Sequence, residues 1–261
     1  MGSIIIVSVL IGAIGLLIGL VLGIAQKKLA VEVDEREVAI RAVLPGNNCG
    51  GCGYPGCDGL AAAIVEGKAP NNGCPVGGSE CAKQIAAIMG EEADENAHYV
   101  AYVHCIGDCD KAARNYQYYG VQDCSMMQYV PDGGSKRCSD GCLGYGNCVK
   151  ACPFEAINIV NGIAVVDKDK CKACGKCIKE CPKHLITLVP YDATAHIACH
   201  SSQKGKSVMD ACKNGCISCT KCVRTCPNEA IVMQNNLPMI DYNKCTNCGT
   251  CVSACPRKTI Q

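Results

Sequence analysis

The stretch CKACGKCIKECP, at residues 171–182, decides the fold of this chain, and it recurs as CISCTKCVRTCP at 216–227 and as CTNCGTCVSACP at 245–256. Each copy separates three cysteines by two residues and places a fourth cysteine before proline. This spacing is typical of thiolates that hold [4Fe-4S] clusters in pairs, with the fourth cysteine reaching the second cluster. Structural zinc sites, the alternative, use separated cysteine pairs or cysteine–histidine mixtures.

The three stretches belong to a larger internal repeat. Its four copies are CVKACPFEAI at 148–157, CIKECPKHLI at 177–186, CVRTCPNEAI at 222–231 and CVSACPRKTI at 251–260. Between the members of each pair lie INIVNGIAVVD and IVMQNNLPMID, which predict strand, turn and strand. We therefore predict an α+β fold with two ferredoxin-like modules, at 136–190 and 191–261, that carry short helices beside the Cys-Pro steps.

Crosswise ligation predicts three complete ligand sets. They are Cys216, Cys219, Cys222 and Cys255; Cys245, Cys248, Cys251 and Cys226; and Cys171, Cys174, Cys177 and Cys152.

A fourth set in these modules lacks one thiolate, because Tyr145 stands where the second repeat has Cys219. The cysteines that keep their places are Cys142, Cys148 and Cys181. We predict Cys138 as the missing ligand; a three-ligand [3Fe-4S] centre is the alternative.

A different motif, CGGCGYPGC at 49–57, precedes these modules and is followed by a further Cys-Pro step. Its thiols, Cys49, Cys52, Cys57 and Cys74, suit one more [4Fe-4S] cluster, although zinc also fits this spacing. We predict a small helical domain at 46–90, with helices over 58–66 and over 80–89. Ser79 is the predicted N-cap of the second helix, and Gly90 ends it.

Six of the 26 cysteines remain: Cys81, Cys105, Cys109, Cys124, Cys199 and Cys212. We interpret Cys81 as a small buried residue of a helix. Three others, Cys105, Cys109 and Cys124, are candidate ligands of a sixth cluster whose fourth cysteine comes from elsewhere. They lie in a region, 91–135, that we predict to be a linker with extra cysteines. Cys124 and Cys199 are interpreted as duplicated positions. The prediction is thus at least five clusters, with a sixth as a further candidate.

The chain begins with an apolar segment, because Ile4 to Ala25 contains no charged residue. A helix of this length crosses a bilayer core of about 30 Å. Lys27 and Lys28 follow at once, so the positive-inside rule predicts a single-pass anchor at 1–26 with the N-terminus outside. The cluster domains are then cytoplasmic, where thiols stay reduced. A cleaved signal peptide, the alternative, would have a basic start and a shorter apolar run.

Glycine recurs every fourth residue of this segment, at Gly15, Gly19 and Gly23. Small residues at this spacing let a second helix approach closely, so we predict contact with integral membrane partners. Residues 27–45 are predicted to be a charged connector.

Other functions are not supported by the sequence. The formal net charge is +1, and no basic patch interleaved with aromatic residues predicts binding of nucleic acid. No dinucleotide or P-loop motif occurs in a suitable context, and the five histidines lack zinc-protease spacing. We predict no catalytic residue and no cofactor other than iron–sulfur clusters.

The order of these motifs closely resembles the B subunit of the Rnf complex. The resemblance rests on the apolar start, on CGGCGYPGC with the following CPVGG at 74–78, and on the repeats that come after. It implies a component of a membrane complex that oxidises reduced ferredoxin, reduces NAD+ and moves Na+ or H+ across the inner membrane of an anaerobe. Flavins and the NAD site are then on other subunits, and soluble ferredoxin is the electron donor.

We predict that electrons pass from ferredoxin through the clusters of Cys245 and Cys216, then those of Cys171 and Cys142, to the N-terminal cluster. Two alternatives remain open from the sequence. One is an iron–sulfur subunit of another membrane oxidoreductase, such as a hydrogenase or a dehydrogenase. The other is a structural or metal-storage protein.

Overall fold

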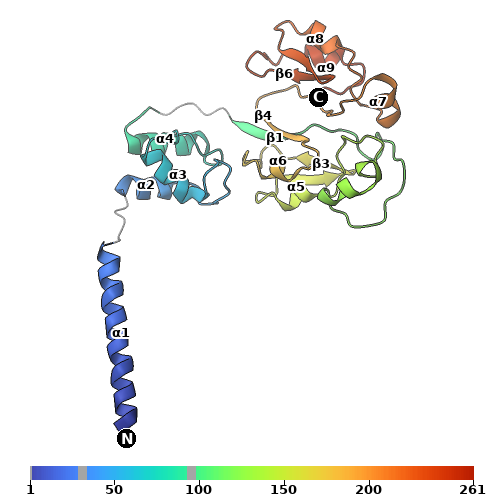
Figure 1. Cartoon of the computed structure of the whole chain (residues 1–261). Coiled ribbons are helices and arrows are strands. Elements are labelled where there is room, and N and C mark those ends of the chain that lie inside the picture. The colour runs from blue at the N-terminus through green and yellow to red at the C-terminus, as the bar shows by residue number, and fades with distance from the viewer. Residues whose placement is uncertain (1, 29–33, 93–97) are drawn as a thin grey trace.

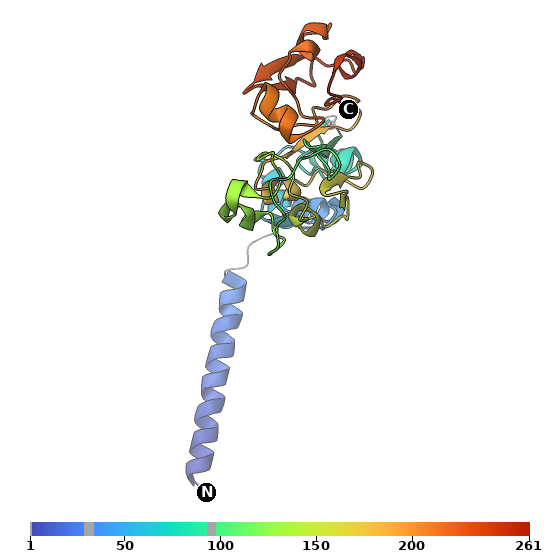
Figure 2. The same cartoon turned by 90° about the vertical axis from the view of Figure 1, so that its right-hand side faces the viewer.

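A computed structural model describes residues 2–28, 34–92 and 98–261 of the chain (Figure 1). It consists of a long helix α1 (Gly2–Lys28), a small helical domain, and two similar repeats built around short hairpins. Helix α1 lies at one end of the molecule and the second repeat lies at the other end (Figures 1 and 2).

The predicted membrane segment, Ile4 to Ala25, lies within α1. Along this segment the structure describes the side chains of Ile6, Leu10 and residues 12–25, whose large apolar members are exposed. Counting only the residues that the structure describes, no helix has the length and apolar character that a membrane span requires.

The helical domain packs three helices around one small core: α2 (Glu35–Val43), α3 (Gly56–Val65) and α4 (Gly78–Met89). Asp34 caps α2 by accepting a hydrogen bond from the backbone N–H of Arg36 at 2.8 Å. Ile40 of α2 is completely buried with Leu60 of α3 and Ile85 of α4. Part of the predicted 27–45 connector is therefore a structural helix of this domain, while residues 29–33 lie outside the described residues.

The two helices predicted over 58–66 and 80–89 are confirmed as α3 and α4, each of which begins two residues earlier than predicted. Gly90 ends α4 in a left-handed conformation with φ of 73°, as expected of a C-terminal glycine. The predicted N-cap, Ser79, is wrong, because Ser79 lies inside α4. The N-cap is Gly77, which has no side chain that could cap the helix. Of the predicted linker at 91–135, residues 93–97 lie outside the described residues.

The first repeat is built from two antiparallel strand pairs and short helices. Its elements are β1 (Tyr99–Val103), the 3-10 helices η1 (Ser125–Tyr129) and η2 (Pro131–Gly133), α5 (Asn147–Lys150), β2 (Ile157–Val160), β3 (Ile163–Val166), α6 (Lys176–Glu180) and β4 (Ile186–Pro190). Strand β1 pairs with β4, and the hairpin β2–β3 turns at Asn161 and Gly162, which both have positive φ as this turn requires. Because β1 lies in the predicted linker at 91–135, that region belongs to the first repeat.

The second repeat has the same plan in a shorter form. It contains α7 (Gly205–Ala211), α8 (Lys221–Thr225), the hairpin β5 (Ile231–Gln234) with β6 (Leu237–Ile240), and α9 (Thr250–Ala254). A single bridge, Ile197 to Ile260, stands where the first repeat has the β1–β4 pair. Aromatic side chains form a contact between the two repeats. The ring centroid of Tyr102, in the first repeat, lies 4.4 Å from that of His196, in the second. His196 Nδ1 is in turn 2.9 Å from the Tyr242 hydroxyl.

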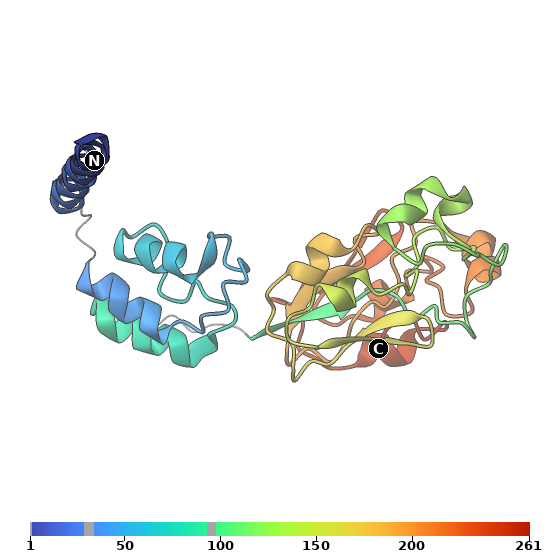
Figure 3. The same ribbon diagram turned by 90° about the horizontal axis from the view of Figure 1, so that it is seen from below.

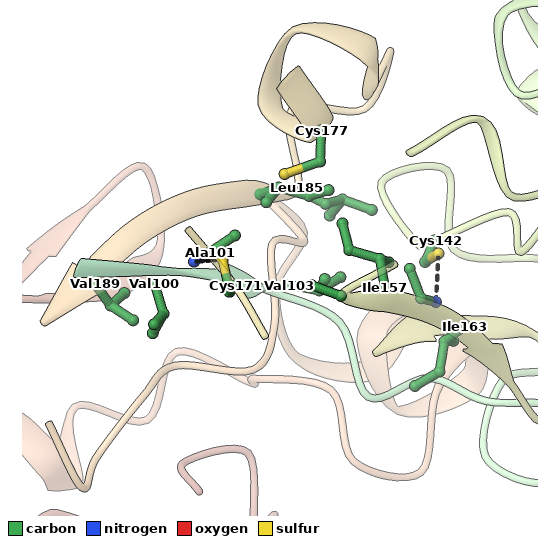
Figure 4. Close-up of a cluster of buried hydrophobic side chains, with 13 residues drawn as sticks. Val100, Ala101, Val103, Cys142, Ile157, Ile163, Cys171, Cys177, Leu185 and Val189 are labelled. Carbon is green, nitrogen blue, oxygen red and sulfur yellow. Dashed lines mark hydrogen bonds between the residues drawn. The ribbon is translucent and has the colours of Figure 1, made fainter. Parts of the chain in front are cut away.

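Cysteine side chains are part of the cores of the repeats. In the first repeat Cys142, Cys171 and Cys177 are buried among aliphatic residues such as Leu185 and Ile157 (Figure 4). In the second repeat, Cys222 and Cys251 are likewise buried in the core. A core this small and this rich in thiols needs a further stabilising group, for which metal clusters are suitable.

Candidate iron-sulfur centres

Eight cysteines of the second repeat line two pockets, four to each. One is lined by Cys216, Cys219, Cys222 and Cys255, and we call it site four. The other is lined by Cys226, Cys245, Cys248 and Cys251, and we call it site five. These are the same sets that crosswise ligation predicts. In each set three cysteines come from one loop and its short helix, and the fourth follows the helix of the other half of the repeat.

The first repeat brings together Cys152, Cys171, Cys174 and Cys177, which we call site three. Burial raises the pKa of Cys177 to about 12, together with the nearby thiols of Cys171, Cys174 and Cys152 and that of Cys148 from the neighbouring group. The backbone N–H of Ala101 in β1 donates to Cys171 Sγ at 3.3 Å (Figure 4). Such N–H···S bonds are common around iron–sulfur clusters, where they tune the reduction potential.

The second group of the first repeat, site two, differs from the prediction. Its pocket is lined by Cys124, Cys142, Cys148 and Cys181, and not by Cys138. The loop that carries Cys124 is held by Asn147, whose side-chain oxygen accepts the backbone N–H of Cys124 at 3.0 Å. Cys124 therefore fills the place that Tyr145 leaves without a thiol.

Cys138 lines another pocket, together with Cys105, Cys199 and Cys212. The predicted grouping of Cys105, Cys109 and Cys124 is thus not what the structure shows, because the three lie in different surroundings. Cys109 is exposed, and the Arg114 guanidinium donates to its sulfur at 3.2 Å.

In the helical domain, Cys52, Cys57 and Cys74 lie together, and burial raises the pKa of the Cys74 thiol. The N–H of Gly77 donates to Cys74 Sγ at 3.3 Å. With Cys49, of the same loop, these thiols form what we call the N-terminal site. Cys81 is buried in α4, as predicted, and burial raises the pKa of its thiol to about 11.

The N-terminal site adjoins site three. Gly51 lies against the backbone of Cys174 so closely that a Cβ built on it would come 2.8 Å from the Cys174 carbonyl oxygen. The helical domain and the first repeat accordingly lie next to each other in Figure 3. The predicted order of clusters, in which the Cys142 cluster precedes the N-terminal one, therefore differs from the spatial order, because Cys174 belongs to site three.

The donor sets, with four thiols in each group, suit [4Fe-4S] clusters. Within the described parts of the chain, no three His, Cys, Asp or Glu side chains converge as ligands of one metal ion. Thiolates that bind a cubane need not converge in this way, since each binds a different iron. Backbone N–H groups also donate to the sulfurs of Cys142, Cys181 and Cys255, at 3.3 to 3.4 Å.

Comparison with known proteins identifies iron–sulfur domains in the same parts of the chain. The family profile described as "Putative Fe-S cluster" matches residues 44–76, and two profiles described as "4Fe-4S dicluster domain" match residues 134–182 and 215–260. The chain is 46% identical over 236 residues to the B subunit of the Na+-translocating ferredoxin:NAD+ oxidoreductase complex of Acetobacterium woodii, a match that covers 90% of this chain and 71% of the relative.

The chain belongs to the B-subunit family of ion-translocating ferredoxin:NAD+ oxidoreductases.

Two further members of this B-subunit family have similar coverage. The B subunit of the proton-translocating complex of Clostridium ljungdahlii is 44% identical, over 92% of this chain and 85% of the relative. The B subunit of the ion-translocating complex of Methanosarcina acetivorans is 41% identical, over 94% and 93%. The profile matches leave out Cys81, Cys105, Cys109, Cys124, Cys199 and Cys212. Sequence reasoning missed the places of Cys124 and Cys138, because neither follows a standard cluster spacing.

Proposed function

We propose that this chain is the membrane-anchored iron–sulfur component that receives electrons from reduced soluble ferredoxin and delivers them to the flavin- and NAD-dependent subunits of an ion-translocating complex. The observation that carries this proposal is the separation of twenty cysteines into five groups of four, in a chain of the B-subunit family. A [4Fe-4S] cluster, when bound, accepts and releases one electron at a time.

Five cysteine sets would hold these clusters. They are Cys49, Cys52, Cys57 and Cys74; Cys124, Cys142, Cys148 and Cys181; Cys152, Cys171, Cys174 and Cys177; Cys216, Cys219, Cys222 and Cys255; and Cys226, Cys245, Cys248 and Cys251. The N–H donors beside these sets stabilise negative charge on sulfur.

Site five is the proposed point at which ferredoxin docks. Cys248 is exposed, whereas every other cysteine of the five sets is at least partly covered. The Thr250 hydroxyl lies 3.2 Å from Cys248 Sγ and holds the pKa of this thiol below its ordinary value. An exposed ligand allows a donor protein to bring its own cluster close to the site.

The N-terminal site is the proposed point at which electrons leave, because α1 would hold this domain at the membrane. Ile4 to Ala25 has no charged residue, and apolar side chains such as Leu16, 73% exposed, have no partner within the chain that the structure describes. Lys27 and Lys28 favour the cytoplasm for everything that follows.

The Gly15, Gly19 and Gly23 face of α1 is the proposed contact with integral membrane subunits. A Cβ built on any of the three would have no atom within 4 Å. Another helix can therefore approach this face closely.

The direction of transfer can be tested with Cys248→Ala in the full-length chain. Reduced ferredoxin is mixed anaerobically with the protein, and reduction of the N-terminal cluster is followed by freeze-quench EPR. We expect reduction at least about tenfold slower than in the wild type, since loss of a thiolate removes or alters the cluster nearest the surface. Cys109→Ala, which changes the other exposed cysteine, is the matched control. An unchanged rate in Cys248→Ala would refute site five as the docking point.

A further inference from the structure

A pocket between the two repeats is lined by four cysteines that none of the five sets uses: Cys105, Cys138, Cys199 and Cys212. They come from four separate segments of the chain. Cys138 lies near both Cys105 and Cys199. Gly107 lies beside both Cys212 and Cys105. A Cβ built on Gly107 would lie 3.4 Å from Cys212 Sγ and 3.7 Å from Cys105 Sγ.

The four cysteines are related by the internal repeat. The N–H of Cys142 donates to Cys105 Sγ at 3.3 Å, and the N–H of Cys216 donates to Cys199 Sγ at 3.4 Å. Cys142 and Cys216 are the equivalent first cysteines of sites two and four. Each repeat thus contributes one cysteine that accepts this hydrogen bond and one that precedes the first cysteine by four positions.

Backbone hydrogen bonds hold the two halves of the pocket together. The N–H of Ala113 donates to the carbonyl of Ala211, and the N–H of Lys213 donates to that of Lys111, both at 2.9 Å. These bonds flank Cys212 and attach its loop to the first repeat. The pocket is therefore a fixed part of the interface.

A buried cation lies at the same pocket. Lys136 is only 5% exposed, and its ammonium donates to the carbonyl of Gly107 at 2.7 Å and to that of Gly162 at 3.2 Å. It has no acidic partner among the ion pairs of the described residues. A buried ammonium needs a nearby negative charge, which four thiolates around a cluster would provide.

We propose that Cys105, Cys138, Cys199 and Cys212 hold a sixth [4Fe-4S] cluster shared by the two repeats. The role of this cluster rests on the proposed electron-transfer function. Through Cys105 it adjoins site two, and through Cys199 it adjoins site four. One electron from ferredoxin that arrives at site four reduces this cluster and then passes to site two, with no change of bonds or protons. The sixth cluster thus connects the repeats.

The proposal is tested by the iron and sulfide content of the full-length chain, purified and reconstituted without oxygen. We expect about 24 iron atoms per chain, against about 20 for five clusters. The double variant Cys138→Ala/Cys199→Ala removes one thiol from each repeat and should bind about four iron atoms fewer. Its reduced EPR spectrum should integrate to about one spin fewer.

The matched control is Cys81→Ala/Cys109→Ala, because these are the two cysteines outside all six sets. It should keep the full iron content. Wild-type iron content in Cys138→Ala/Cys199→Ala, or one zinc ion per wild-type chain with iron for five clusters, would overturn the sixth cluster. If the double variant misfolds and loses all iron, the wild-type stoichiometry decides. Absence of iron from the wild-type chain would instead refute the proposed function.

Discussion

At the scale of single residues, Tyr145 and Cys124 account for the four thiols that line site two. The first repeat has tyrosine where the second has Cys219, and its pocket is completed by Cys124 from a loop that comes earlier in the chain. Asn147, next to the site-two ligand Cys148, fastens that loop through the backbone N–H of Cys124. In the proposed ligand set, Cys124 thus takes the role in site two that Cys219 has in site four.

The variant Cys124→Ala should leave three thiolates at site two. We expect it to lose about one iron atom per chain and to show the signal of a [3Fe-4S] centre in EPR of the oxidised protein. Restoring the repeat's own ligand, in Cys124→Ala/Tyr145→Cys, should bring back the four-iron centre. Cys138→Ala should give no such signal from site two. A [3Fe-4S] signal from site two in Cys138→Ala, and none in Cys124→Ala, would contradict this ligand set.

At the scale of elements, α2 and β1 are the segments whose place the sequence did not reveal. Both lie in regions predicted to be connectors, and both complete a core. Helix α2 buries Ile40 between α3 and α4, although most of its residues are charged or exposed. Strand β1 pairs with β4 along its whole length and donates the Ala101 N–H to site three.

The contribution of α2 can be measured with Ile40→Ala. Removing a fully buried isoleucine side chain should destabilise the helical domain by about 2–5 kcal/mol. Anaerobic denaturant unfolding, followed by circular dichroism and by cluster absorbance, measures this loss. Val38→Ala in the same helix is the control, because Val38 is 59% exposed and should change stability by less than about 0.5 kcal/mol. Equal effects of the two variants would mean that α2 does not stabilise the domain.

At the scale of the whole molecule, charge is distributed unevenly along the chain. The second repeat has exposed basic side chains at Lys204, Lys206, Lys213, Lys221, Arg224, Lys244 and Lys258. Its acidic residues are fewer: Asp192, Asp210, Glu229 and Asp241. The helical domain at the other end has more acidic than basic residues. A negatively charged donor is therefore attracted to the end of the molecule that carries site five.

Salt should accordingly slow the reaction with ferredoxin. Raising ionic strength from about 0.05 to 0.5 M should lower the second-order rate of reduction by about tenfold or more, because screening removes electrostatic steering. Stopped-flow absorbance measures the rate. Lys244→Glu/Lys258→Glu in the second repeat, where Lys244 directly precedes Cys245 of site five, should be slow even at low salt, whereas Lys68→Glu/Lys83→Glu in the helical domain should not. A rate independent of salt would exclude docking by charge.

The sequence alone determined the chemistry of this protein. Cysteine spacing predicted the cluster type, the two repeats and the hairpins, because ligands of one cluster lie within a few residues of each other and a hairpin needs only its own turn. The same reasoning failed for Cys124, Cys138, Cys105, Cys199 and Cys212. These residues belong to segments that are far apart in the sequence and adjacent in the structure, and local cysteine spacing cannot predict which of them are adjacent. Only the tertiary structure decided which thiols share a pocket. It also showed that α2 and β1 belong to cores and that site three adjoins the N-terminal site. The physical reason is that contacts between segments distant in the sequence are determined by packing.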